Sequence, residues 1–166
     1  MPSGTQSFTY DCGTKSLQLV MAYYGVEVPY YKLLRKINCH KRYGLPGNKM
    51  ANIARGYGFK VKSESNCSLG KIKRHISKKE PVIILIQAWA ENNLTELEWE
   101  ETEDYGHYSI VIGIDEGKVY FNDPLSFNKT WLTEQEFLNR WHGDGNKKFA
   151  LFISGRNPCN GMEHMD

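Results

Sequence analysis

The chain has 166 residues, of which 40% are apolar, and this size and composition suit a single domain with its own buried core. Its net charge of +2 gives no reason to expect a nucleic acid or a general membrane surface as a partner. The N-terminal residues lack a signal-peptide pattern, and the longest apolar run, Val82 to Ile86, is far shorter than a membrane span, so we expect a cytoplasmic protein.

The stretch from Gln6 to Gly25 predicts a helix that begins close to Cys12. Its large apolar residues recur at the spacing of one buried helical face, and a glycine ends the run. These residues are Leu17, Val20, Met21, Tyr24 and Gly25. The free N–H groups and positive dipole end of a helix N-terminus favour a thiolate, the nucleophilic form of cysteine. Cys12 is therefore a candidate nucleophile, with a small buried apolar residue as the alternative.

The rest of the first half predicts three further helices and one strand. A second helix follows Pro29, and a third helix ends at Gly58. Phe59 to Lys62 alternates as an edge strand does, and Ser68 is suited to cap a fourth helix. Helices therefore dominate this half of the chain.

The second half has the character of a sheet. Val82 to Ile86 predicts a strand that is buried on both faces. Glu91 to Asp104 carries seven acids and no base, and we expect an exposed excursion anchored by Leu97 and Trp99. If this excursion lines a cleft, it would favour basic peptides; the alternative is a solvated loop.

A β-hairpin, a short helix and a last strand complete the second half. The hairpin strands are expected at residues 106–114 and 119–123, and Thr133 to Glu136 forms a capping box that opens the helix. Phe149 to Ile153 is the last predicted strand, and the tail after Arg156 is expected to be loosely held. These elements predict an α+β fold with a helical lobe at about residues 12–78, a sheet lobe at about 81–155, and a cleft between them.

The hairpin supplies a candidate base and a group to hold it. With a three-residue loop, Ile114 pairs with Lys118, and Ser109 then lies opposite Asp123. His107 becomes the diagonal neighbour of Asp123 on the same face. A two-residue loop would put the two side chains on opposite faces. Taken alone, a histidine in this position is more often a surface residue.

An oxyanion donor is the remaining requirement of a catalytic thiol. Gln6 lies six residues before Cys12, and its amide could fold back beside the sulfur. The alternative is a solvated loop residue. Asp11 is expected to cap the helix. Lys15, one turn inside it, is expected to point to solvent; the alternative is that its ammonium supports the thiolate.

The other cysteines carry no such pattern. Cys39, Cys67 and Cys159 form no CxxC pair with each other or with Cys12, so a structural zinc site is not expected. We take these three as ordinary thiols.

Several motifs, in order along residues 6 to 153, resemble the bacteriocin-processing, double-glycine leader peptidase family of papain-like cysteine peptidases. They are Gln6-x4-Asp11-Cys12-Gly13, Tyr24-Gly25, Gly106-His107-Tyr108, Gly113-Ile-Asp115 and Asn122-Asp123-Pro124. The resemblance implies a papain-like fold and peptide hydrolysis through an acyl-enzyme, often after Gly-Gly, with a peptide or protein substrate and no metal or organic cofactor. It implies that Cys12 is the nucleophile, His107 the general base, Asp123 the orienting carboxylate and Gln6 the oxyanion donor.

The chain departs from the transporter-fused members of that family. It contains neither membrane helices nor a G-x4-G-K-[ST] nucleotide-binding loop, so it resembles the free-standing branch. Two other functions fit the same residues: an acyl or peptidyl transferase that uses the same Cys-His-Asp site, and a non-catalytic peptide-binding module. The sequence does not indicate an oligomeric state.

Overall fold

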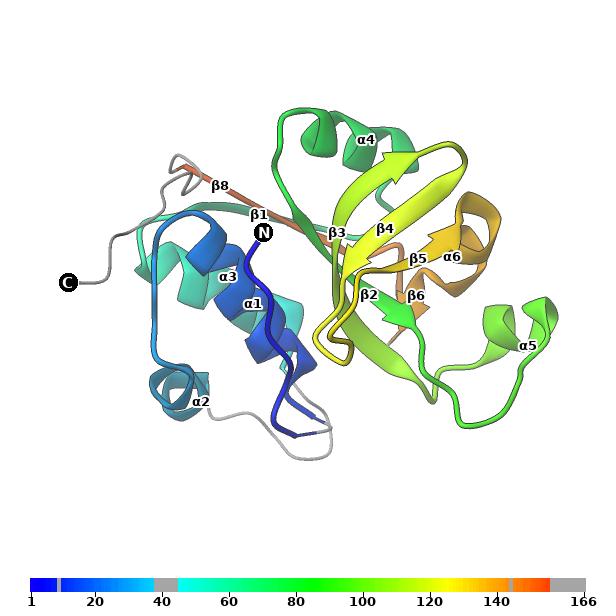
Figure 1. Ribbon diagram of the computed structural model, residues 1–166, viewed down its shortest axis with the longest axis horizontal. Helices are drawn as coiled ribbons and strands as arrows, with labels where there is room; N and C mark the ends of the chain where they lie inside the picture. The colour runs from blue at the N-terminus through cyan, green and yellow to red at the C-terminus, as the bar shows by residue number, and fades with distance from the viewer. Residues whose placement is uncertain (9, 38–44, 144, 156–166) are drawn as a thin grey trace.

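A computed structural model describes residues 1–8, 10–37, 45–143 and 145–155 (Figure 1). Its helices are α1 (Cys12–Tyr23), α2 (Tyr30–Ile37), α3 (Gly47–Gly56), α4 (Leu69–Ser77), α5 (Glu96–Glu101) and α6 (Glu134–Arg140). Its strands are β1 (Lys60–Glu64), β2 (Val82–Gln87), β3 (Gly106–Asp115), β4 (Lys118–Asn122), β5 (Thr130–Thr133), β6 (His142–Gly143), β7 (Asn146–Lys147) and β8 (Ala150–Ser154).

A six-stranded sheet with the order β1-β8-β2-β3-β4-β5 is the centre of the fold. Every strand pairing is antiparallel, as the α+β prediction required. The apolar run at Val82 became β2, and all of its residues are buried because β8 and β3 flank it and helices cover both faces. The predicted edge strand became β1, which pairs only with β8.

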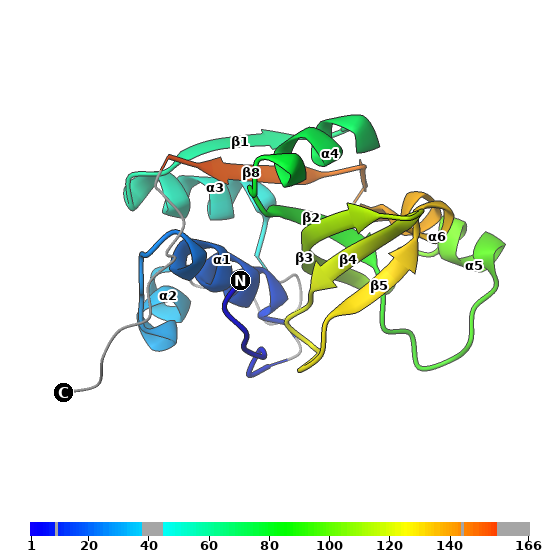
Figure 2. The ribbon, with the colours of Figure 1, turned by 45° about the horizontal axis from the view of Figure 1, so that its top comes forward.

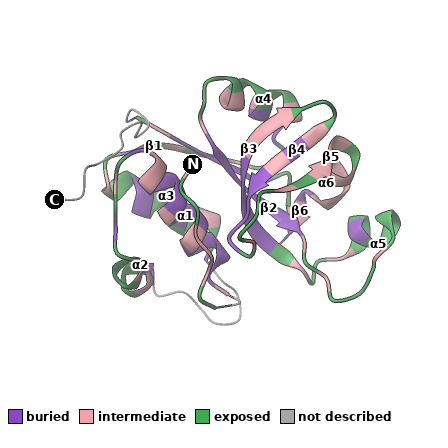
Figure 3. Ribbon diagram, in the orientation of Figure 1, coloured by how far each residue is buried: buried purple, intermediate pink, exposed green. Residues whose placement is uncertain are grey.

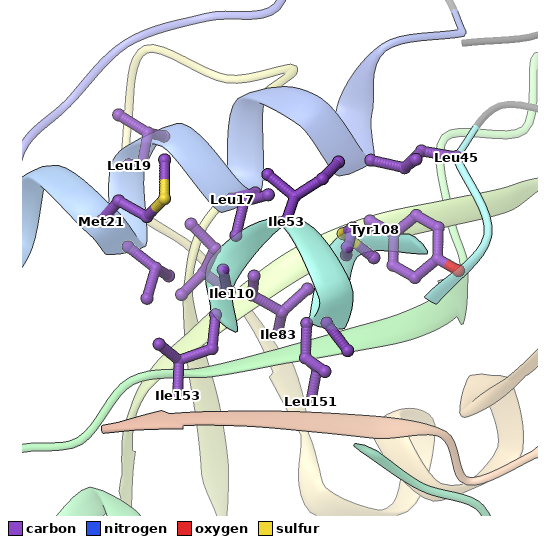
Figure 4. Packing of buried hydrophobic residues seen from close by; sticks show 14 of the residues in the cluster. Leu17, Leu19, Met21, Leu45, Ile53, Ile83, Tyr108, Ile110, Leu151 and Ile153 are labelled. Atoms are coloured by element: carbon purple, nitrogen blue, oxygen red, sulfur yellow. The ribbon is translucent and has the colours of Figure 1, made fainter. Parts of the chain in front are cut away.

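Helices α1, α2 and α3 lie on one side of the sheet (Figures 1 and 2). The predicted apolar face of α1 is buried, with Leu17, Val20 and Met21 fully inaccessible to solvent. These side chains join residues of α3, β2, β3 and β8 in one core, part of which Figure 4 shows. Figure 3 colours the inward turns of α1 and α3 and the central strand β2 as buried. This core fixes α1 against the sheet.

A second core lies on the opposite face of the sheet. There α4 contributes Ile72 and α6 contributes Phe137, which stacks on Trp141 with ring centroids 4.8 Å apart. Both predicted caps formed: Ser68 accepts from the Lys71 backbone N–H, and Thr133 forms the capping box of α6. From the sequence, α4 was predicted to belong to the helical lobe with α1. In the structure its buried residue Ile72 belongs to the second core, so α4 packs on the opposite face of the sheet from α1.

The acidic excursion differs from its prediction in two ways. Glu96–Glu101 forms the helix α5, which a capping box at Thr95 opens and which the sequence reading did not foresee. Trp99 is buried under Arg140, as expected of an anchor, but Leu97 is 62% exposed and anchors nothing. The helix packs against α6, away from α1 in both views (Figures 1 and 2). This position gives no support to the expected preference for basic peptides.

Among the residues that the structure describes, no helix is both long enough and apolar enough to cross a membrane. The predicted loose tail after Arg156 lies outside the described residues, as do Cys39 and Cys159.

Candidate active site

Cys12 is the first residue of α1, where the sequence predicted it, and it is 8% exposed. The backbone of Tyr108 in β3 connects it to the sheet. The Tyr108 N–H donates to the Cys12 Sγ at 3.5 Å, and the Tyr108 carbonyl accepts from the Ser16 hydroxyl at 3.2 Å. One residue of the sheet therefore holds both ends of the first turn of the helix.

Gly13 permits this close contact between helix and strand. A Cβ atom added at this position would lie 3.1 Å from Cδ2 of Tyr108 and 3.3 Å from Cβ of Leu45. Contacts this short are tighter than ordinary van der Waals contacts, so a methyl group here would require its neighbours to shift by a few tenths of an ångström. The Cys-Gly pair is thus explained by packing.

The hairpin has the predicted register at His107 and Asp123, but its loop is shorter than predicted and its first strand contains a bulge. Its loop has two residues, Glu116 and Gly117, both at positive φ, and Asp115 pairs with Lys118. The three-residue loop was therefore wrong, because Glu116 tolerates the left-handed conformation that was assigned to glycine alone. A β-bulge between Val111 and Gly113 adds one residue to β3 and restores the alternation, so that Ile110 pairs with Asn122.

As a result His107, Ser109 and Asp123 share one face at the same end of the hairpin. His107 Nε2 lies 3.1 Å from Oδ1 and 3.0 Å from Oδ2 of Asp123. The Ser109 hydroxyl donates to Oδ2 at 2.6 Å, and the Leu125 N–H donates to Oδ1 at 2.8 Å. Each carboxylate oxygen therefore accepts two hydrogen bonds, and the carboxylate is held firmly against the imidazole.

The electrostatics of this pair favour the charged forms. Burial lowers the pKa of His107, but its hydrogen bonds to Asp123 and to Cys12 outweigh burial and raise the pKa to about 9. Burial raises the pKa of Asp123, but the hydrogen bonds from His107, Ser109 and Leu125 outweigh burial and lower it. Since the Nε2 side of the ring faces Asp123, Nδ1 is the nitrogen left to exchange a proton with the thiol.

Gln6 reaches the site through its backbone. Its N–H donates to the carbonyl of Pro124, the residue after Asp123, at 2.7 Å. Its side-chain Nε2 donates to the Phe8 carbonyl at 2.7 Å, and its buried Oε1 meets no hydrogen-bond partner in the described part of the chain. The structure thus brings Gln6 beside the carboxylate end of the site and orients its amide locally.

Asp11 occupies the N-cap position of α1, as predicted, but its side chain makes no capping hydrogen bond. Its Oδ2 accepts instead from the backbone N–H groups of Ser7 and Phe8, at 3.3 and 3.2 Å, and from the Tyr30 hydroxyl. The chain folds back just before the helix, so the N–H groups of Ser7 and Phe8 lie within hydrogen-bond distance of the Asp11 carboxylate. The carboxylate bonds to these groups and not to the first turn of α1. Asp11 therefore shapes the segment that carries Gln6.

Lys15 is half-buried and does not point freely into solvent as expected. Its ammonium donates to Gln18 Oε1 at 2.9 Å and lies 4.9 Å from the centroid of the Tyr30 ring. Burial lowers the pKa of Lys15, and the charge of Asp11 partly opposes that change. The side chain supports the packing of α2 on α1.

A pocket of about 420 Å³ adjoins the carboxylate end of the site. Ser109 and Asp123 form one wall, and Ile86, Phe121 and Leu132 supply apolar surface. Trp89 and Trp131, each 51% exposed, also line it. The pocket is therefore mainly apolar and aromatic, and it is open next to the candidate catalytic residues.

Three contacts at this site were not assigned a function from the sequence. They are the Ser109 hydroxyl, the Leu125 N–H and the Tyr108 N–H. The register placed Ser109 opposite Asp123, so its contact could have been predicted, whereas the two backbone donors depend on tertiary packing. In the described residues no three His, Cys, Asp or Glu side chains gather as metal ligands do. Cys67 is a free, buried thiol in the second core.

The structure thus places a thiol at the start of a helix, and an imidazole and a carboxylate on an antiparallel hairpin that contacts that helix. A family model described as the Peptidase C39 like family matches residues 2–149. The chain therefore belongs to the Peptidase C39 like family. No curated protein matches the chain significantly.

Several solved structures are similar to this one in fold. A protein of Bacillus anthracis described as a C39-like peptidase has a TM-score of 0.74 at 21% identity, covering 93% of this chain and 94% of that chain. The peptidase domain of Streptococcus ComA, a bifunctional ABC transporter involved in quorum sensing, has a TM-score of 0.70 at 20% identity, covering 92% and 97%. A double-glycine-motif protease from an AMS/PCAT transporter, in complex with the leader peptide, has a TM-score of 0.65 at 20% identity, covering 92% and 89%. The predicted fold class and the suspected family are thereby confirmed.

Proposed function

We propose that this protein is a cysteine peptidase that cleaves a peptide bond through an acyl-enzyme on Cys12. The observation that carries the proposal is the buried His107–Asp123 pair next to the thiol. His107 Nε2 lies 3.1 and 3.0 Å from the two carboxylate oxygens of Asp123, and the N–H of Tyr108, the residue after His107, donates to the Cys12 Sγ. A nucleophile, a base and a group that orients the base are the three parts that this chemistry requires. Membership of the C39-like family supports the same reaction class.

In the proposed reaction, the Cys12 thiolate attacks the carbonyl carbon of the scissile bond. The Gln6 amide and the Cys12 backbone N–H stabilise the oxyanion, and Phe8 orients that amide by accepting one of its two N–H groups. His107, whose pKa is raised to about 9, carries the proton at neutral pH and donates it to the leaving amine. The neutral imidazole then takes a proton from water, which attacks the thioester and releases the acid.

The pocket beside Asp123 is proposed to hold an apolar side chain of the substrate. Its lining of Ile86, Phe121 and Leu132, with two half-exposed tryptophans, favours an apolar residue. Lys129 and Arg140 line the same pocket and disfavour a cationic residue there. We propose a peptide with a Gly-Gly-type site as the first substrate to examine. This choice rests on the similarity of fold to the double-glycine-motif protease solved with a leader peptide.

The test is cleavage of a peptide library by the wild type and by Cys12→Ala, with the products identified by mass spectrometry. The expected result is cleavage by the wild type only, with an acyl-enzyme of Cys12 trapped at low pH. A parallel reaction with added amines and thiols separates hydrolysis from transfer, because a transferase gives conjugates in place of the free acid. Binding of peptides with unchanged affinity in both proteins and no cleavage in either would replace the peptidase with a peptide-binding module.

A further inference from the structure

The segment of residues 1–8, here called the N-terminal strap, lies across both parts of the candidate site. At one end it contacts the hairpin, where the Pro2 carbonyl accepts a hydrogen bond from Nδ2 of Asn122 at 2.9 Å. Further along, the Gln6 N–H donates to the Pro124 carbonyl at 2.7 Å. The strap therefore bonds to the residues on both sides of Asp123.

The strap also contacts α1. A Cβ atom added at Gly4 would lie 3.1 Å from Cε of Lys15 and 3.6 Å from Cδ2 of Leu19, so the strap backbone lies directly on that helix. Asp11 accepts from the N–H groups of Ser7 and Phe8 and fixes the turn between strap and helix. Gln6 lies between Pro2, which is bonded to Asn122, and the turn at Ser7 and Phe8, which is bonded to Asp11.

Asn122 is the side chain that attaches the strap to the sheet. It is 5% exposed, and its Oδ1 accepts from the Lys129 ammonium while its Nδ2 donates to the Pro2 carbonyl. An ammonium can only donate and a backbone carbonyl can only accept, so the two neighbours fix the amide in one orientation. An amide can satisfy both partners at once, whereas a carboxylate or an alkyl group cannot.

We infer that Asn122 is a positioning residue, which holds the N-terminal strap and thereby places the Gln6 amide at the oxyanion site. The latch formed by Asn122, Lys129 and Pro2 is read from the contacts alone; its effect on rate rests on the proposed function. Cys12 and His107 are held by other contacts, through Tyr108 and Asp123. Loss of the latch should therefore slow the reaction without changing how the thiol and the imidazole interact.

The test uses Asn122→Asp in the full chain, which keeps the size of the side chain and its acceptor for Lys129 but replaces the donor to Pro2 with a second acceptor. We expect the Gln6 N–H to exchange with solvent deuterium at least about tenfold faster than in the wild type. We expect kcat to fall about tenfold with KM nearly unchanged, because the oxyanion is bound more tightly in the transition state than in the ground state. Asn128→Asp, the same change at an exposed residue of the loop that follows β4, is the control.

The Gln6→Ala variant shows whether Asn122 acts through Gln6. We expect the double variant Asn122→Asp, Gln6→Ala to be no slower than Gln6→Ala alone, since the latch has no further residue to place. The inference would be overturned if the losses of rate in the two single variants multiply in the double variant. It would also be overturned if the Gln6 N–H exchanges no faster in Asn122→Asp than in the control Asn128→Asp.

A second variant decides the question if Asn122→Asp does not fold. Lys129→Met removes the cation that orients the amide, at a residue exposed enough to tolerate it, and should also speed exchange of the Gln6 N–H, by less than Asn122→Asp. Wild-type exchange in Lys129→Met would contradict the latch. If the wild type cleaves no peptide, the proposed function fails, while the exchange rates still decide whether the latch exists.

Discussion

Asp123 and Cys12 belong to one site, but the hydrogen bonds that hold them differ in origin. Asp123 accepts hydrogen bonds from three residues, all within its own hairpin or the turn that follows it. Among the described residues, the backbone hydrogen bond to the Cys12 thiol comes from Tyr108, which lies 96 residues away in the sequence. The base side of the site is thus built locally, whereas the thiol side depends on how α1 packs against β3. Substitutions on the two sides should therefore impair the reaction in different ways.

The largest expected effect is that of removing the nucleophile. Cys12→Ala should lower kcat/KM for peptide cleavage by about 10⁴-fold or more, because the proposed acyl-enzyme forms on this thiol. Cys67→Ala is the control, since it removes the other described free thiol from a core that lies on the opposite face of the sheet. Residual cleavage by Cys12→Ala above a tenth of the wild-type rate would exclude an acyl-enzyme on this residue.

A change on the base side should alter both the rate and its pH dependence. Asp123→Asn keeps the size of the side chain but removes the charge that raises the pKa of His107 to about 9. We expect kcat/KM to fall by about 10²- to 10⁴-fold. In the wild type the rate should decline as the pH rises through about 9, where the imidazolium is lost, and in the variant this decline should move to lower pH. If the rate of Asp123→Asn declines at the same alkaline pH as that of the wild type, the carboxylate does not set the pKa of His107.

The same pKa predicts a pH-dependent stability. Because the pKa of His107 is raised from 6.5 to about 9 in the folded protein, its contribution to the free energy of unfolding is complete below pH 6.5 and is lost as the pH rises through about 9. The contribution is at most about 3 kcal/mol. Urea unfolding at several pH values should show this decline in the wild type and not in His107→Ala. Parallel curves for the two proteins would contradict the predicted stability.

A change on the thiol side should lower the rate without moving the pH profile. Gly13→Ala adds a Cβ atom 3.1 Å from the Tyr108 ring, and the resulting shift of α1 should lower kcat by about tenfold. Gly70→Ala in α4 is the matched control, because no atom lies within 4 Å of the added Cβ. This control should keep full activity and gain up to about 1 kcal/mol of stability from helix propensity. Equal activity in both variants would show that the helix end tolerates displacement.

Most of the elements could be predicted because their signals are local. The apolar spacing of α1, the β-branched run of β2 and the capping box of α6 each lie within one element. The short strand β5 and the helix α5 were missed, since Thr130–Thr133 has no apolar run and the acids of α5 concealed its capping box. Local patterns therefore identified the long elements and not the short polar ones.

The site shows where local patterns are insufficient. The pairing of His107 with Asp123 was predicted from a loop that does not form, and it holds because the bulge at Ile112 adds the residue that the shorter loop removes. Gly113 lies at this bulge, and a glycine inside a strand often marks one, but this signal was not used to predict the register. Asp11 was expected to cap the helix, and only the path of the N-terminal strap explains why its carboxylate turns to Ser7 and Phe8.

The most direct test of the proposed Cys12–His107 pair is the rate of iodoacetamide alkylation of Cys12 between about pH 6 and 8, followed by mass spectrometry, in the wild type and in His107→Ala. Below its pKa of about 8.5, an ordinary thiol reacts about tenfold faster for each pH step of one, because only the thiolate reacts. A thiolate paired with His107 predicts a nearly constant rate in the wild type and the steep rise of an ordinary thiol in His107→Ala. The same steep rise in both proteins would contradict the Cys12–His107 pair and the peptidase with it.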